Sequence, residues 1–146
     1  MQLRHADTED ELRACFPLMR QLRPHLADPT DFIARVRRMA AQRYRLLGAW
    51  RDDEPLALAG YRLDENLIYG SFLYVDDLVT HESSRGCNLG ARLLDSLTES
   101  AQRAGCAKLV LDTGLSNALA QRFYFRQGLL TSAMRFSKPL EQETPR

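Results

Sequence analysis

Three consecutive segments set the expected architecture: Leu73-Tyr-Val-Asp-Asp-Leu-Val-Thr80, then His81-Glu-Ser-Ser-Arg-Gly-Cys-Asn-Leu-Gly-Ala91, then Arg92-Leu-Leu-Asp-Ser-Leu-Thr-Glu-Ser-Ala101. The first is an apolar extended run, the second is a polar loop with two glycines, and the third is an amphipathic helix. The first N–H groups of such a helix have no intrahelical acceptor, and the helix dipole adds partial positive charge there. The arrangement therefore suits a phosphate or pyrophosphate.

The chain after this loop predicts a parallel pair of strands. A helix is expected from about Leu89 to Ala104, with Gly105 as its C-terminal cap, and Lys108–Asp112 is a short apolar run typical of a buried strand. A strand, a helix and a second strand in this order make the two strands parallel neighbours with a right-handed crossover. The pattern then predicts a helix over about 117–127, one or two closing strands over 129–133 and 134–140, and a frayed polar tail over 141–146.

The chain before the loop predicts two helices and an antiparallel meander. Thr8 and Glu11 form a capping box that opens a helix ending near Arg23, and Asp28-Pro29 opens a second helix. Gly60 indicates a bulge or a close approach of backbone within its strand. Extended segments are expected at 3–6, 44–50, 56–63 and 67–80. The whole pattern predicts one α/β domain over residues 1–146, with about four helices and a mixed sheet of six or seven strands.

The composition of the chain excludes several classes of protein. The net charge is +1, which gives no general attraction to nucleic acid or to a membrane surface, and no apolar run is long enough to span a bilayer. The three cysteines, Cys15, Cys87 and Cys106, have no metal-site or disulfide spacing. We therefore expect a cytoplasmic protein with free thiols, no bound metal, no nucleic-acid partner and no membrane partner.

The glycine-bearing loop alone indicates only a general anion site. It lacks the lysine-serine pair of a P-loop and the G-x-G-x-x-G spacing of a dinucleotide fold. Two longer segments make the pattern more specific. Arg85, Asn88, Gly90 and Ala91 resemble the Arg/Gln-x-x-Gly-x-Gly/Ala loop of the GNAT superfamily of N-acetyltransferases. The segment Asn117-Ala-Leu-Ala-Gln-Arg-Phe-Tyr-Phe-Arg-Gln-Gly-Leu129 is similar to the second motif of that superfamily.

The resemblance covers almost the whole chain and implies a GNAT-like fold that uses acetyl-CoA as a cosubstrate. In such a fold the parallel strands splay around the cosubstrate, the loop holds its pyrophosphate, and the preceding strand pairs with its pantetheine arm. The residues that the resemblance assigns to acetyl-CoA are Leu78, Val79, Thr80, Arg85, Gly86, Cys87, Asn88, Leu89, Gly90, Ala91, Asn117 and Phe123. Asn88 departs from the usual glycine, and asparagine is the residue that next best tolerates a positive φ.

The resemblance also implies a catalytic acid, and residues near the loop and strand ends are candidates for the base. A tyrosine at the place of Tyr124 often protonates the departing thiolate, and a phenol is a plausible acid for that step. Asp77 is the candidate base, with Asp76, His81, Glu82 and Asp112 left open as alternatives. Since successive strand side chains point to opposite faces, only one of Asp76 and Asp77 is expected to face the acceptor cleft.

The expected activity is transfer of an acetyl group from acetyl-CoA to a primary amine on a small molecule or a peptide. The alternative is a non-catalytic module that binds acyl-CoA or a partner protein with the same fold. A homodimer is compatible with the resemblance, because dimers are common in such folds.

Overall fold

The computed structural model describes residues 1–142, which divide into two compact units, 1–111 and 112–142. The frayed tail that the sequence predicts lies outside the described residues from position 143 onward. The prediction of one domain over residues 1–146 stays a prediction.

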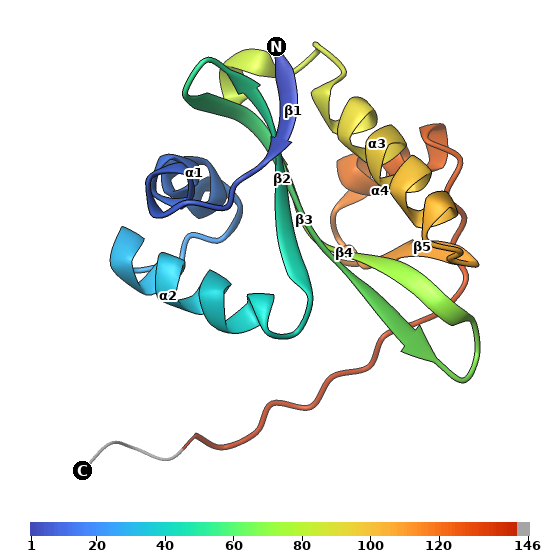
Figure 1. Ribbon diagram of the computed structural model, residues 1–146. Helices are drawn as coiled ribbons and strands as arrows, with labels where there is room; N and C mark the ends of the chain where they lie inside the picture. Colours follow the sequence, from blue (N-terminus) through green and yellow to red (C-terminus); the bar gives the residue numbers. More distant parts are fainter. Residues whose placement is uncertain (143–146) are drawn as a thin grey trace. The chain divides into compact units, whose positions relative to one another are not determined.

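The first unit is built on a five-stranded sheet in the order β1-β2-β3-β4-β5 (Figure 1). Its strands are β1 (Gln2–His5), β2 (Tyr44–Arg51), β3 (Glu54–Asn66), β4 (Gly70–Thr80) and β5 (Lys108–Leu111). The first four pair antiparallel, and β5 runs parallel to β4. The mixed α/β sheet is therefore confirmed, although the expected number of six or seven strands was too high.

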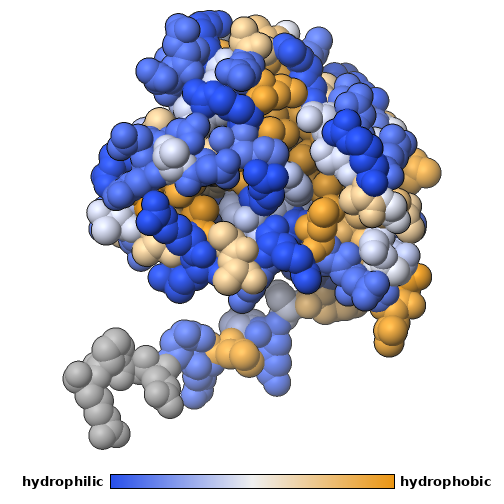
Figure 2. Space-filling model, in the orientation of Figure 1, coloured by the Kyte–Doolittle hydropathy of each residue, from blue (hydrophilic) through white to orange (hydrophobic). Residues whose placement is uncertain are grey.

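Three helices cover the two faces of this sheet. Helices α1 (Glu9–Leu22) and α2 (Pro29–Ala40) lie on one face, and α3 (Leu89–Arg103) lies on the other (Figure 1). The capping box of Thr8 and Glu11 and the Asp28 cap are both formed as predicted. Helix α1 continues through Pro17. Both faces are apolar: Phe16, Leu46 and Leu58 are buried in the cluster beneath α1 and α2, and α3 buries Leu93 and Leu97. Charged and polar side chains cover most of the face in Figure 2.

The strand β4 is bulged where it passes Gly60 of β3. Gly60 is paired with Asp77 and Tyr61 with Val75, which leaves Asp76 as the extra residue. The predicted irregularity at Gly60 is thus confirmed. A bulge places two residues of one strand opposite one residue of its partner and alters where the side chains point.

The second unit contains the helix α4 (Ala118–Arg126) and an extended segment after it. Asn117 caps α4 through its side chain, and Gly128 follows the helix with a φ of 88°. The prediction of closing strands over residues 129–133 and 134–140 was wrong, since residues 129–142 belong to no strand. Alternation of side chains makes a segment compatible with a strand, but a strand forms only where a neighbouring backbone completes the ladder.

Candidate active site

The loop between β4 and α3 leads into the N-terminus of α3, where the helix dipole adds partial positive charge. It contains one short 3-10 turn at Glu82–Ser84, and Asn88 precedes α3 with φ 58° and ψ 26°. That is the left-handed conformation, which confirms that this position requires a residue tolerant of positive φ. Among the described residues, no side chain caps the N-terminus of α3. Its first backbone N–H groups are therefore available to an anion, as the sequence predicts.

The edge of β4 is unpaired next to this loop. The parallel pairing of β4 with β5 extends from Phe72–Lys108 to Val75–Leu111 and stops there. Within residues 1–111, the remaining part of β4, from Asp76 to Thr80, pairs only with β3. Leu78, Val79 and Thr80 thus have one strand edge that another extended chain can occupy.

Asp77 is held by two partners that come from distant parts of the sequence. The Arg23 guanidinium donates to Asp77 Oδ1 at 3.1 Å from Nε, with Nη2 at 2.9 Å from the same oxygen. The Tyr44 hydroxyl donates to Asp77 Oδ2 at 2.7 Å. Burial, followed by the adjacent Asp77 carboxylate, raises the pKa of Tyr44 well above its ordinary value, so the hydroxyl stays protonated and keeps donating.

Asp76 belongs to the same cluster as Asp77, contrary to the expectation that the two side chains face opposite sides. Arg62 donates to both carboxylate oxygens of Asp76, at 3.0 Å and 3.2 Å, and its guanidinium lies 5.6 Å from the Tyr44 ring centroid. The bulge at Asp76 is the physical reason, because it breaks the two-residue alternation of β4. Burial raises the pKa of Asp76, and the Arg62 guanidinium opposes that rise.

The cluster thus combines two carboxylates, Asp76 and Asp77, with two guanidinium groups and one phenol. Sequence reasoning missed Arg23, Tyr44 and Arg62. No local spacing could have identified them, because Arg23 and Tyr44 are 54 and 33 positions away from Asp77. Such a cluster can bind an ammonium through its carboxylates and an acidic group through its guanidinium groups.

In the second unit, α4 carries the predicted acid Tyr124 beside Phe123. The two rings are 5.5 Å apart between centroids. Burial raises the pKa of the Tyr124 phenol above its ordinary value of 10.0, so the group is protonated at neutral pH. Asn117 Oδ1 accepts a hydrogen bond from the Ala120 N–H at 3.2 Å, which fixes that side chain at the start of the helix.

The other candidate bases and the cysteines have simpler environments. His81 Nδ1 accepts a hydrogen bond from the Ser83 N–H at 3.1 Å, and Asp112 lies in the second unit, 2.6 Å from the Arg135 guanidinium. Cys15 is fully buried, which raises the pKa of its thiol to about 12, whereas Cys87 is exposed on the loop.

The described part of the chain, residues 1–142, contains no group of His, Cys, Asp and Glu able to hold a metal ion. It also contains no helix with the length and apolar character needed to cross a membrane.

Comparison with known proteins identifies N-acetyltransferases as relatives of this chain. Residues 6–129 match the family described as the acetyltransferase (GNAT) family. The chain is 31% identical to an aminoalkylphosphonate N-acetyltransferase of Salmonella typhimurium, over 95% of this chain and 91% of that protein. It is 27% identical to the uncharacterized N-acetyltransferase YhdJ of Bacillus subtilis, over 96% of this chain and 99% of that protein. A solved structure titled as a transcriptional regulator from Bacillus halodurans shares the fold, with a TM-score of 0.85 and 20% identity over 95% of this chain and 99% of that chain.

Proposed function

Because this chain belongs to the acetyltransferase (GNAT) family, we propose that it transfers an acetyl group from acetyl-CoA to the primary amine of a small acceptor. The observation that carries the proposal is the loop with Asn88 in the left-handed conformation, followed by an uncapped helix start. The N–H groups within Gly86–Ala91, apart from that of Cys87, which donates to Ser84 O, bind the pyrophosphate of acetyl-CoA, with Arg85 adding positive charge. The open edge of β4 at Leu78–Thr80 binds the pantetheine arm by added-strand pairing.

The proposed chemistry is direct attack of the neutral amine on the thioester carbonyl. The amine nitrogen forms the new C–N bond, the C–S bond breaks, and the thiolate leaves. Asp77 takes a proton from the amine, and Tyr124 gives a proton to the thiolate. The contacts of Asp77 with Arg23 and Tyr44 hold its carboxylate in one orientation, which suits a group that must meet the acceptor in a fixed geometry.

We infer further that the acceptor carries an acidic group as well as its amine. A relative is named an aminoalkylphosphonate N-acetyltransferase, and the cluster of Asp76, Asp77, Arg23 and Arg62 offers both signs of charge on one face. Release of thiol from acetyl-CoA should be at least about 10-fold faster with 2-aminoethylphosphonate than with ethylamine, because the guanidinium groups add charge-assisted hydrogen bonds. Equal rates with both amines would contradict this inference and leave the acetyl transfer itself intact.

Acetyl-CoA binding measured by calorimetry tests the whole proposal. No detectable affinity at millimolar acetyl-CoA would overturn it. Binding without thiol release, across a panel of polyamines, aminoglycosides, amino acids and aminoalkylphosphonates, would support the non-catalytic binding module instead.

Substitution of Asn88 by valine should weaken acetyl-CoA binding by about 10-fold or more, because a β-branched residue is strongly disfavoured at positive φ and the loop must rearrange. Asn88→Gly should bind at least as tightly as the natural protein. Asp52→Val is a matched control for backbone strain: Asp52 has a φ of 56° in the turn between β2 and β3 and does not belong to residues 85–91. That variant should lose stability and keep its affinity. Equal affinity of Asn88→Val and the natural protein would contradict the loop assignment.

Saturating acetyl-CoA should slow the reaction of Cys87 with N-ethylmaleimide, because Cys87 is exposed within the proposed pyrophosphate loop. Peptide mass spectrometry follows each thiol separately. Cys106 serves as an internal reference, and Cys15 should react only after unfolding because it is fully buried. An unchanged rate at Cys87 with acetyl-CoA bound would show that the cosubstrate lies elsewhere.

A further inference from the structure

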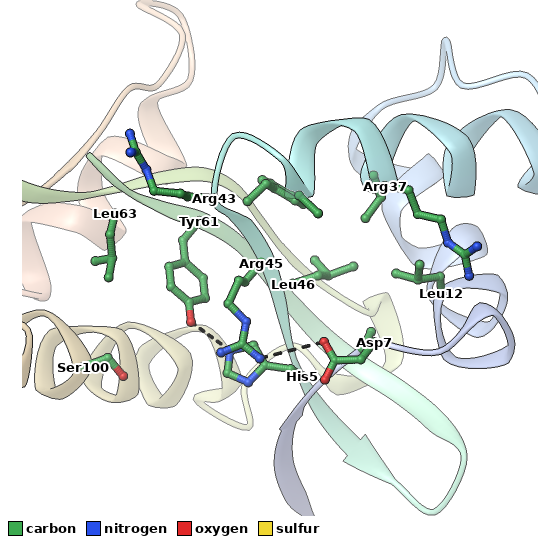
Figure 3. Close-up of a pocket in the computed structure, with 14 residues that line it drawn as sticks. His5, Asp7, Leu12, Arg37, Arg43, Arg45, Leu46, Tyr61, Leu63 and Ser100 are labelled. Atoms are coloured by element: carbon green, nitrogen blue, oxygen red, sulfur yellow. Dashed lines mark hydrogen bonds and ion pairs between the residues drawn. The ribbon is translucent and has the colours of Figure 1, made fainter. Parts of the chain in front are cut away.

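A cavity of about 690 Å³ lies at the open edge of the sheet in the first unit (Figure 3). It forms where β1 ends: His5 pairs with Leu47 in the last step of the β1–β2 ladder, so the start of β2 at Tyr44–Leu46 extends beyond β1. Tyr44, which donates to Asp77, is the one member of the Asp76–Asp77 cluster among its lining residues, and no residue assigned above to acetyl-CoA lines it. A cavity of this size is typical of sites for small molecules.

Four of the polar side chains that line this cavity meet at one place (Figure 3): His5, Asp7, Arg45 and Tyr61. His5 Nε2 lies 2.8 Å from the hydroxyl of Tyr61, which is itself buried. Burial lowers the pKa of His5, so its ring is neutral at pH 7 and adds hydrogen-bonding capacity without charge.

The Arg45 guanidinium interacts with the Tyr61 hydroxyl and is only loosely paired with Asp7. Its Nη2 atom lies 3.8 Å from Asp7 Oδ1, and both side chains are more than half exposed. An exposed pair at this distance contributes little free energy. A carboxylate that accepts two parallel hydrogen bonds from the same guanidinium would interact more strongly.

The rest of the lining favours a ligand with a hydrocarbon body and one acidic group. Leu12, Val36, Leu46 and Leu63 contribute apolar surface, and the lining carries the three arginines Arg37, Arg43 and Arg45 against the single acidic residue Asp7. Arg43 is already paired with Asp64 at 2.7 Å. We propose that this cavity is a second binding site, for a small organic acid whose carboxylate binds Arg45 and whose hydrocarbon body contacts the apolar lining.

The test is a titration of the full chain with sodium phenylacetate, followed by ¹H–¹⁵N NMR without acetyl-CoA. Saturable shifts are expected at the amides of Arg45 and Tyr61, with no shift at residues 85–91. Phenylacetamide, which has the same ring and no charge, should bind at least about 10-fold more weakly, because a charge-assisted hydrogen bond is lost.

Two variants and one control make the result specific to this cavity. Arg45→Gln should raise the Kd for phenylacetate by about 10-fold or more, and Tyr61→Phe should raise it by a smaller factor. Arg51→Gln changes an exposed arginine of the same strand outside the lining, and it should leave the Kd unchanged. Equal binding of phenylacetamide, an unchanged Kd in Arg45→Gln, or no saturable shift up to about 20 mM ligand would each overturn the proposal.

Discussion

Replacement of Tyr124 by phenylalanine should lower kcat for thiol release by about 10-fold or more, because the variant has no proton to give to the departing thiolate. Burial raises the pKa of the Tyr124 phenol, so the natural residue remains the acid form throughout the neutral range. The substitution keeps the ring and its contact with Phe123, at 5.5 Å between centroids. The expected loss therefore concerns the hydroxyl alone.

The affinity of Tyr124→Phe for acetyl-CoA and a control variant, Tyr69→Phe, separate a chemical role of Tyr124 from a binding role. The Kd for acetyl-CoA, measured by calorimetry, should change little in Tyr124→Phe, whereas a purely structural role would alter affinity or stability together with the rate. Tyr69→Phe removes a phenol from the turn before β4 and should keep the natural kcat. A kcat for Tyr124→Phe within about twofold of the natural value would exclude the phenol as the catalytic acid.

The second large effect is expected from Gly60→Ala, which should reduce the free energy of unfolding by about 1–3 kcal/mol, the usual cost of overpacking. A Cβ atom at this position would collide with the Tyr44 hydroxyl and lie 2.6 Å from Asp77 Oδ2. Tyr44 is buried, and the side chain of Asp77 is only 13% exposed, so neither can move away freely. Thermal or chemical denaturation measures the loss, and the rate of thiol release should fall with it, because the collision displaces the predicted base.

A matched control and a double mutant define the cause of this effect. Gly114→Ala adds the same methyl group where no atom lies within 4 Å and φ is not positive, so its effect should stay within about 0.5 kcal/mol. In the Gly60→Ala background, Tyr44→Phe should cost less than in the natural protein, because it removes the nearer of the two Tyr44 atoms that collide; Tyr44 Cζ, at 2.6 Å, remains. Additive effects of Gly60→Ala and Tyr44→Phe would contradict a direct collision.

The sequence alone determined the local elements and the loop at the start of α3. Hydrophobic periodicity, the Thr8 and Asp28 caps and the glycines after helices identified the helices, because these signals act over one or two turns of chain. The positive φ at Asn88 was also predictable, since it depends on the conformational range of a single residue. Gly60 indicated the place of an irregularity, although the extra residue of the bulge is Asp76 in β4.

The tertiary structure decided what depends on partners far apart in the chain. The expected closing strands over residues 129–140 have suitable side chains, yet strand formation needs a neighbouring backbone that no local pattern specifies. Asp76 and Asp77 were expected on opposite faces, but the bulge brings both into one cluster with Arg23, Tyr44 and Arg62. Those contacts join segments of α1, β2, β3 and β4, and only the packing of α1 on the sheet and the pairing of the strands bring them together.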